Sequence, residues 1–423
     1  MKSLRVKPEG NAVIPSARIT SVATRSGKPH IVIIVENMPV PADRRVWQQA
    51  TALVDNGWRV SVICPKSAAH PQSREVLEGV EIHRHSLPCE ANGIMGYIAE
   101  YSAALMMETL ALLRIGLGKI DIVQICNPPD FLFVPALMAK WAGGAKIIFD
   151  HHDLTPELLA EKTGKDNGAL MQFARWSEKQ TFRVASKIIS TNTTFAKLAK
   201  NRGGKSDQDV NVVYSAPDMN RMPRVQTNSA LKKGKDKLIL WIGMIGSQDG
   251  VDLLLEAIRI LKFDMKYSDF HVLIAGDGPE REKLIQYAHE TDIAAHISFP
   301  GFLSGHAFFE ALSTADIGVG SDPKNDFNDR LAMNKVMEYM AYGLPIAMFD
   351  LAECRKIAGD AALVAQGNDP VSLAGKLKTL LDDEPLRLRL GQAGYNRLTE
   401  YYAWEKQKEI YLRTCLQVLE AAA

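Results

Sequence analysis

Lys335 and Glu338 lie three residues apart in the stretch "NDRLAMNKVMEYMAYGLP", residues 328–345. A helix beginning near Met333 would direct its unpaired N–H groups at a diphosphate, and Lys335 would add a positive charge. One turn further along, Glu338 would accept hydrogen bonds from both hydroxyls of a ribose. The pattern therefore suits a nucleotide, although a solvated Glu338 paired with Lys335 fits the same spacing.

Two glycine-rich loops follow predicted strands of the same half of the chain. In "WIGMIGSQDGVD", residues 241–252, Gly243 and Gly246 would let the backbone turn tightly before a helix. The loop "AGDGPE", residues 275–280, has the same character. Neither is a G-x-G-x-x-G motif after the first strand, so a nicotinamide dehydrogenase is the weakest of the enzyme classes considered.

The segment "FDHHDLTPEL", residues 149–158, places two acidic and two histidine side chains at the end of a predicted buried strand. Burying such groups is costly unless they serve a purpose. A metal site is conceivable, but its ligands would be adjacent and no distant His or Cys motif completes it. Asp153 is also expected to cap a helix with Pro156 and Glu157 in its first turn, so both capping and chemistry are predicted here.

The elements that must position these residues form two similar series. Short β-branched runs alternate with helical stretches, which is typical of parallel sheets covered on both faces. Strands are expected at residues 30–37, 58–65, 80–88, 120–126, 145–150, 186–192 and 210–217, and then at 237–244, 270–276, 296–301, 315–321 and 344–351. The order predicts an α/β protein with two doubly wound domains facing a central cleft.

The expected organisation has five parts. They are a flexible arm at 1–28, a first domain at 29–217, a linker at 218–235, a second domain at 236–400, and a terminal helix at 401–423. The 423 residues are too many for one ordinary core, which agrees with two domains.

Composition narrows the class of protein. Fifty basic and 49 acidic residues leave a net charge of +1, so the overall charge of the protein does not indicate a nucleic-acid partner. Five scattered cysteines indicate neither a disulfide framework nor a zinc cluster, and favour a reducing, cytoplasmic compartment. Charged residues interrupt the most apolar stretch, 93–118, so it is expected to be a helix with a buried face. A surface helix that touches lipid is the alternative.

Five stretches, in both halves and in order, resemble the retaining GT-B glycosyltransferases of family four, particularly the bacterial branch that builds exopolysaccharide and surface glycans. They read "NMPVPADRRVWQQATALVDNGWRVSVICP", "FDHHDLTPEL", "IGMIGSQDGVDLLLEAI", "LIAGDGPEREKL" and "NDRLAMNKVMEYMAYGLPIAMFDLAECRKIAGDAALV". The resemblance spans roughly residues 30–400. It implies two Rossmann-like domains, with the acceptor bound mainly by the first and the nucleotide-sugar by the second. It also implies that the terminal helix crosses back onto the first domain.

The resemblance also implies roles for individual residues. Glu338 matches the ribose-binding glutamate of the family, Lys335 lies where the helix start meets the diphosphate, and His152 matches the histidine that faces the donor sugar. The catalytic candidates are His152, Asp153 and Lys335. The donor-binding candidates are Gly243, Gly246, Asp329, Arg330, Asn334, Lys335 and Glu338. The candidates on the acceptor side are Arg44, Arg45 and His151.

The chain departs from the family at the donor phosphates. Many relatives carry a glutamate eight positions before the ribose-binding one, where this chain has Arg330 beside Asp329. Many also carry an Arg and a Lys in the loop after the first strand of the second domain, at positions taken here by Met244 and Asp249. Charge balance leads to the hypothesis that Arg330 compensates and that Asp329 takes over the sugar contact. The other candidates for the missing charge are Lys335 and Arg45.

The resemblance favours front-face displacement from a UDP- or GDP-type sugar, with protein charge in place of a metal and with no cofactor. The acceptor would be a glycan, a lipid-linked molecule or a small molecule. A lipid-linked acceptor would place the protein at the inner face of the cytoplasmic membrane as a peripheral protein, while the oligomeric state stays open. Two alternatives stay open as well: a nucleotide-sugar 2-epimerase of the same architecture, and a non-catalytic nucleotide-binding partner subunit.

Overall fold

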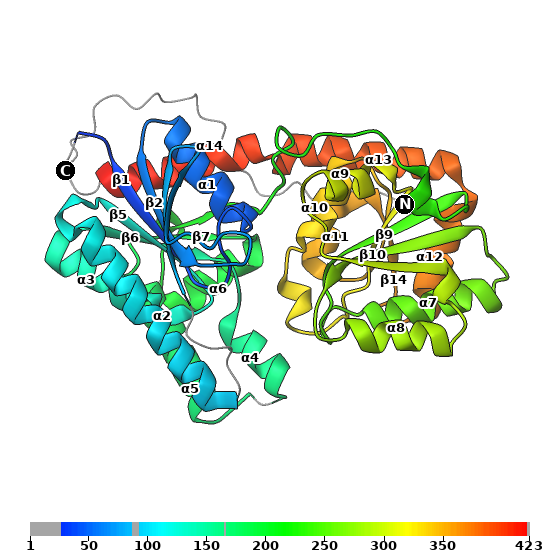
Figure 1. Cartoon of the computed structure of the whole chain (residues 1–423), viewed down its shortest axis with the longest axis horizontal. Coiled ribbons are helices and arrows are strands. Elements are labelled where there is room, and N and C mark those ends of the chain that lie inside the picture. Colours follow the sequence, from blue (N-terminus) through cyan, green and yellow to red (C-terminus); the bar gives the residue numbers. More distant parts are fainter. Residues whose placement is uncertain (1–26, 87–92, 165, 421–423) are drawn as a thin grey trace. The chain divides into compact units, whose positions relative to one another are not determined.

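The computed structural model describes residues 27–86, 93–164 and 166–420, which divide into two compact units. The N-terminal unit runs to Tyr214 and takes up the chain again at Glu405, and the C-terminal unit comprises Ser215–Trp404. Figure 1 shows both units as sheets covered by helices. The expected arm at 1–28 falls almost wholly outside the described residues.

The N-terminal unit contains an eight-stranded sheet in the order β3-β4-β2-β1-β5-β6-β7-β8, parallel except for β3. Its strands are β1 (His30–Val35), β2 (Arg59–Pro65), β3 (Arg74–Leu77), β4 (Val80–His85), β5 (Ile122–Cys126), β6 (Lys146–His151), β7 (Lys187–Ser190) and β8 (Val210–Val212). Its helices are α1 (Arg44–Asp55), α2 (Gly93–Ile115), α3 (Phe133–Gly143), α4 (Thr155–Thr163), α5 (Ala169–Val184), α6 (Thr193–Gly203) and α14 (Trp404–Glu420). Helices α2, α3 and α5 lie on one face of the sheet and α1 and α14 on the other (Figure 1).

Helix α14 is fastened to the N-terminal unit by buried hydrogen bonds. Gln407 accepts from the backbone N–H of Tyr214 at 3.0 Å, and the Tyr411 hydroxyl donates to Gln124 on β5 at 2.8 Å. Because buried polar groups are costly without partners, these bonds specify where the helix docks. The helix therefore packs on the first domain, as expected for the end of the chain.

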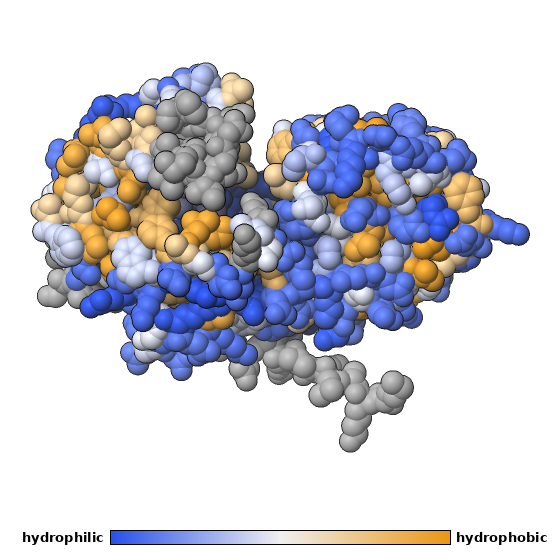
Figure 2. Space-filling model, turned by 90° about the horizontal axis from the view of Figure 1, so that it is seen from below, coloured by the Kyte–Doolittle hydropathy of each residue, from blue (hydrophilic) through white to orange (hydrophobic). Residues whose placement is uncertain are grey.

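Helix α2 lies where the apolar stretch 93–118 was expected and has the predicted buried face. Its side chains at positions 104, 108, 112 and 115 are buried, whereas Met106, Leu110 and Leu113 are exposed. Figure 2 shows one face of the molecule, on which apolar side chains of this unit gather beside hydrophilic ones. None of the helices in the described ranges is both long and apolar enough to cross a membrane.

The C-terminal unit contains a six-stranded parallel sheet in the order β11-β10-β9-β12-β13-β14. Its strands are β9 (Lys237–Met244), β10 (Phe270–Asp277), β11 (Ile297–Gly301), β12 (Ile317–Gly320), β13 (Ile346–Phe349) and β14 (Ala362–Ala365). Its helices are α7 (Val251–Phe263), α8 (Arg281–Glu290), α9 (Gly305–Thr314), α10 (Asn334–Ala341), α11 (Ala352–Ala358), α12 (Pro370–Asp382) and α13 (Glu384–Arg397). Helices α7, α8 and α12 bury their apolar stripes against one face of this sheet (Figure 1).

The structure differs from the sequence prediction at several elements. Strands β3 and β14 were not expected, and β8 is shorter than the predicted strand 210–217. The segment 218–235, expected as a linker, belongs to the C-terminal unit. Asn228 donates its backbone N–H to Thr314 at 2.9 Å, and Lys232 forms an ion pair with Asp316 at 2.8 Å. Side chains of the C-terminal unit therefore fix this segment, although its sequence shows no hydrophobic periodicity.

Candidate functional site

The centre of the C-terminal sheet is a topological switch point. Strand β9 has β10 on one side and β12 on the other, and the chain proceeds outward from it in both directions. In open parallel sheets, ligands bind beyond the carboxyl ends of the strands at such a point. The loops after β9 and β12, residues 245–250 and 321–333, therefore define the candidate site.

Glycines let these two loops approach each other and β10 closely. A Cβ at Gly250 would lie 2.0 Å from the carbonyl oxygen of Ser321, and one at Gly276 would lie 1.9 Å from that of Gly243. Real Cβ atoms do not tolerate such distances, so only glycine fits. Gly243 also has a φ of 155°. The sequence had indicated tight turns here, and the close packing of β9, β10 and β12 is their physical reason.

Lys335 is buried at the start of α10 and forms an ion pair within the site. Its Nζ lies 2.9 and 3.0 Å from the two carboxylate oxygens of Asp322 and 4.5 Å from the ring centre of Trp241. Trp241 donates its indole N–H to Ser321 at 3.1 Å. The ion-pair partner of Lys335 is thus Asp322 from the loop after β12, not Glu338 on its own helix. Asp322 is a residue that the sequence analysis missed.

Glu338 lies one turn inside α10 and is 7% exposed, so it is not a solvated surface residue. The neighbouring Tyr339 fixes the helix against the sheet. Its hydroxyl accepts the backbone N–H of Ile242 at 3.2 Å and lies 3.0 Å from the carbonyl oxygen of Leu240. Asn334, the first residue of α10, is exposed. The helix start that was predicted to meet a diphosphate is therefore held rigidly at the ends of β9 and β12.

Two donor-binding candidates have structural partners that change their interpretation. The backbone N–H of Gly246 is bonded to the Asp249 carboxylate at 2.9 Å, so it is occupied within its own loop. Asp329 accepts the backbone N–H of Ala352 at 2.7 Å, at the start of α11. One carboxylate oxygen of Asp329 therefore fixes the start of α11, and the expected sugar contact of Asp329 stays a prediction. Arg330 is half-buried at the end of a short turn, Asn328–Arg330, four residues before α10.

The loop after β9 is acidic rather than basic, as the sequence departures implied. Met244 is 65% exposed, and Asp249 is half-buried. Burial raises the pKa of Asp249, and the charge of Lys335 opposes this shift. Lys335 is the buried cation beside these two loops. It forms an ion pair with Asp322, and its charge also acts on the carboxyl group of Asp249.

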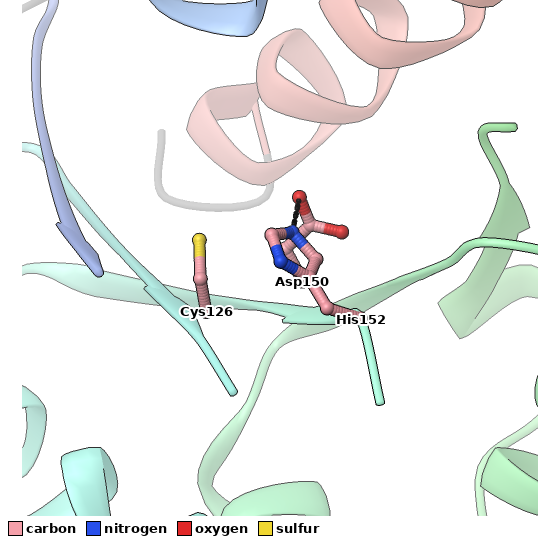
Figure 3. A group of neighbouring side chains, drawn as sticks. All are labelled: Cys126, Asp150 and His152. Carbon is pink, nitrogen blue, oxygen red and sulfur yellow. Dashed lines mark ion pairs between the residues drawn. The ribbon is translucent and has the colours of Figure 1, made fainter. Parts of the chain in front are cut away.

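In the N-terminal unit, Asp150 at the end of β6 is the centre of a buried polar cluster. Its side chain is fully buried and accepts from Arg45 Nη2 at 2.6 Å and from Gln49 Nε2 at 2.6 Å. His152 Nε2 lies 2.9 Å from Oδ2 of Asp150 (Figure 3). Burial alone would raise the pKa of Asp150, but the charges of Arg45 and His152 hold it well below its usual range. The cluster therefore fixes the imidazole of His152 against a permanent carboxylate.

Cys126, Asp150 and His152 also bring potential metal-ligand atoms within 4.8 Å of one another (Figure 3). These three side chains are not suited to bind a metal cation. The Asp150 carboxylate already receives the Arg45 guanidinium, which occupies the place of a positive ion. Burial raises the pKa of the Cys126 thiol well above its usual value, whereas metal binding needs the thiolate.

Asn127, at the carboxyl end of β5, shapes the turn that carries His152. Its Oδ1 accepts the backbone N–H groups of His152 at 2.7 Å and of Asp153 at 3.2 Å. Its Nδ2 donates to the carbonyl oxygen of Asp153 at 2.7 Å. The sequence analysis did not single out this residue, although its position directly after a buried strand was the available signal.

His151, the acceptor-side candidate of this segment, lies in the core. The His151 side chain is fully buried among Phe149, Phe182 and Phe195, and burial lowers its pKa to about 3. His151 is therefore a core residue, and its assignment to the acceptor side is wrong.

Asp153 does not cap α4 as expected. Residue 154 takes the N-cap position without a side-chain bond, while Asp153 accepts the N–H of that same residue at 2.9 Å. Pro156 and Glu157 do lie in the first turn of α4.

The two arginine candidates on α1 differ in exposure. Arg45 is buried against Asp150 and so is not free for an acceptor or for a donor phosphate, whereas Arg44 is exposed.

Comparisons with known proteins agree with this architecture. Residues 224–397 match the family described as glycosyl transferases group 1, and residues 42–214 match the glycosyl transferase 4-like domain. The glycogen synthase of Mycobacterium tuberculosis is 22% identical over 377 residues, which cover 86% of this chain and 87% of that protein.

Two solved structures share the fold of the whole chain. Sucrose-phosphate synthase from Thermosynechococcus elongatus has a TM-score of 0.75 at 16% identity, covering 94% of this chain and 100% of that chain. Anabaena HepE in complex with UDP and glucose has a TM-score of 0.70 at 13% identity, covering 92% and 100%. The two family matches account for both units, and the chain therefore belongs to the group 1 glycosyltransferases of the GT-B fold.

Proposed function

We propose that this glycosyltransferase moves a sugar from a nucleoside diphosphate sugar, of UDP or GDP type, to its acceptor with retention of the anomeric configuration. The observation that carries the proposal is the position of Lys335 and Glu338, one turn apart on a buried helix at the switch point of the C-terminal sheet. An ammonium at a helix start suits a diphosphate, and a carboxylate one turn inside suits the two hydroxyls of a ribose. The complex of Anabaena HepE with UDP and glucose supports this assignment by its fold alone.

Lys335 would exchange partners when the donor binds. In the free protein its ammonium is held by Asp322, so its position is set before the diphosphate arrives. A fixed charge aimed at the departing diphosphate stabilises the transition state without reorganisation. Arg330 is the second positive charge proposed for this task, because Met244 and Asp249 stand where relatives have basic residues.

The proposed reaction needs no metal ion or cofactor. The acceptor hydroxyl oxygen forms the new bond to the anomeric carbon on the face from which the diphosphate leaves. A phosphate oxygen of the donor takes the hydroxyl proton. His152 orients the transferred sugar, and its ion pair with Asp150 supports this role by fixing the ring. We further propose a glycan or lipid-linked acceptor in the synthesis of surface polysaccharide, with the protein acting at the cytoplasmic side of the membrane.

A panel of nucleotides tests the donor assignment. We expect UDP or GDP, rather than ADP or TDP, to raise the melting temperature of the full chain, because a ligand that binds only the native state stabilises it by mass action. A ligand at about 100 times its Kd would add roughly 2.7 kcal/mol. Sugar derivatives of that nucleotide should then release the diphosphate when acceptor is present. A protein that responds to none of the four nucleotides would contradict the proposal.

A further inference from the structure

A pocket lies in the N-terminal unit, and none of its lining residues belongs to the Asp150 cluster. It is a cavity of about 330 Å³ between the β3–β4 edge of the sheet and helix α2. Lys66 and Ser86, which line it, directly follow β2 and β4, so the pocket opens at the carboxyl ends of these strands. That edge is where ligands of open parallel sheets are expected.

Among the residues that the structure describes, the lining of this pocket carries positive charge and no carboxylate. Its Lys and Arg members are Lys66, Arg74, Arg84 and Arg114. Apart from Arg84, none of them has an ion-pair partner among the residues that the structure describes. In a chain with a net charge of only +1, such a concentration is a local feature rather than a general excess.

Neighbouring titratable groups do not cancel this charge. Arg84 is already neutralised by Glu75 at 2.7 Å. Burial lowers the pKa of His85 to about 4, so this residue is neutral near pH 7. Burial, together with the charge of Glu36, raises the pKa of Glu108 well above its usual value, and this carboxyl lies behind His85 rather than among the described lining residues. The pocket therefore keeps the positive charge of three side chains.

The opposite wall of the pocket is apolar. Helix α2 contributes Met106, Met107 and Leu110, of which Met106 is 58% and Leu110 42% exposed. Lys66 and Arg74 come from the side of the sheet, and Arg114 lies on α2 one turn beyond Leu110. Cations beside such an apolar wall suit a ligand that joins an anionic group to a hydrocarbon portion. Phosphate is the anion that several Lys and Arg side chains bind best together.

We propose that this pocket binds a phosphate group attached to an apolar chain, and that this ligand is the acceptor of the transferase. The binding itself rests on the pocket residues alone. Only its assignment as the acceptor rests on the proposed function. Nucleotide binding by the C-terminal unit is a separate measurement, so a failure of one proposal is distinguishable from a failure of the other.

Binding of farnesyl phosphate to the full chain tests the pocket. We expect farnesyl phosphate to bind more tightly than either farnesol or inorganic phosphate, because each of these lacks one of the two parts. The triple variant Lys66→Ala/Arg74→Ala/Arg114→Ala should weaken this binding by at least about tenfold, since charge-assisted contacts are lost. Added salt should weaken the binding to the wild-type protein as well.

The matched control removes three exposed cations elsewhere on the same unit. The variant Lys119→Ala/Lys179→Ala/Lys197→Ala should keep the wild-type Kd, and wild-type hydrogen exchange in peptides from β5 and β6 would show that the N-terminal unit of both triple variants is folded. Equal binding of farnesol, or an unchanged Kd in the pocket variant, would overturn the proposal. It would also be overturned if the pocket variant lost binding only to phosphatidylcholine vesicles containing phosphatidylglycerol, because the basic residues would then serve a membrane surface.

Discussion

Replacing Arg45 with Met is expected to destabilise the N-terminal unit by about 3–5 kcal/mol, because it leaves a buried charge without its main partner. The Asp150 side chain is fully buried, and Arg45 supplies two contacts to it, at 2.6 and 3.1 Å. Urea unfolding checks this prediction when it is followed by hydrogen exchange in peptides from β5 and β6. These peptides report on the N-terminal unit separately from the other one.

The effect should depend on pH in a defined direction. In the wild-type protein the pKa of Asp150 is held low, so the pair stabilises the fold at neutral pH and is lost only at strongly acidic pH. Without Arg45, burial raises the pKa of Asp150, so the penalty present at neutral pH shrinks as the pH falls and the carboxyl takes up a proton. Arg44→Met, at the exposed neighbouring position, should cost less than about 1 kcal/mol. Equal effects of the two variants would contradict the role given to Arg45.

The second large effect is expected at Lys335. Lys335→Met should lower kcat/KM for sugar transfer by roughly 100- to 1000-fold, the loss typical of removing a group that stabilises charge developing in the transition state. Release of the nucleoside diphosphate is the quantity to measure. The single variant also leaves Asp322 buried and unpaired, so a loss of stability would accompany the loss of activity.

A double variant separates the two consequences. Lys335→Met/Asp322→Asn removes both charges, so we expect it to regain stability while activity stays low. Asp322→Asn alone keeps the ammonium and removes the carboxylate that competes with the donor, so nucleotide binding should be retained. Recovery of activity in the double variant would show that Lys335 acts only through the stability of the fold.

The sequence predicted the two sheets and the position of helix α10 well, because both depend on local patterns. Apolar runs bounded by glycine mark the strands, and Lys335 and Glu338 share one helix. Asp322 was missed because its partner lies thirteen residues away across a loop, and no periodicity connects them. Its position just after β12 was the only signal.

In the segment around Asp150, the alternation of side chains along a strand could have predicted from the sequence which residues enter the core. Side chains alternate between the faces of a strand, so Phe149 and His151 point to one side and Asp150 to the other. His151 accordingly lies in the aromatic core, while Asp150 meets Arg45 and Gln49 from α1. The contact of Tyr411 with Gln124, 287 residues apart, depends on tertiary docking that no local pattern contains.

The central claim is that Glu338 holds the ribose of a nucleoside diphosphate, and a comparison of ribose with 2′-deoxyribose tests it most directly. With the nucleotide that stabilises the chain best, calorimetry should give a Kd at least about tenfold lower for the ribo form than for the 2′-deoxy form, since one charge-assisted hydrogen bond is lost. In Glu338→Leu the two forms should bind alike. Equal affinities in the wild-type protein, or a preference that survives in Glu338→Leu, would contradict the assignment.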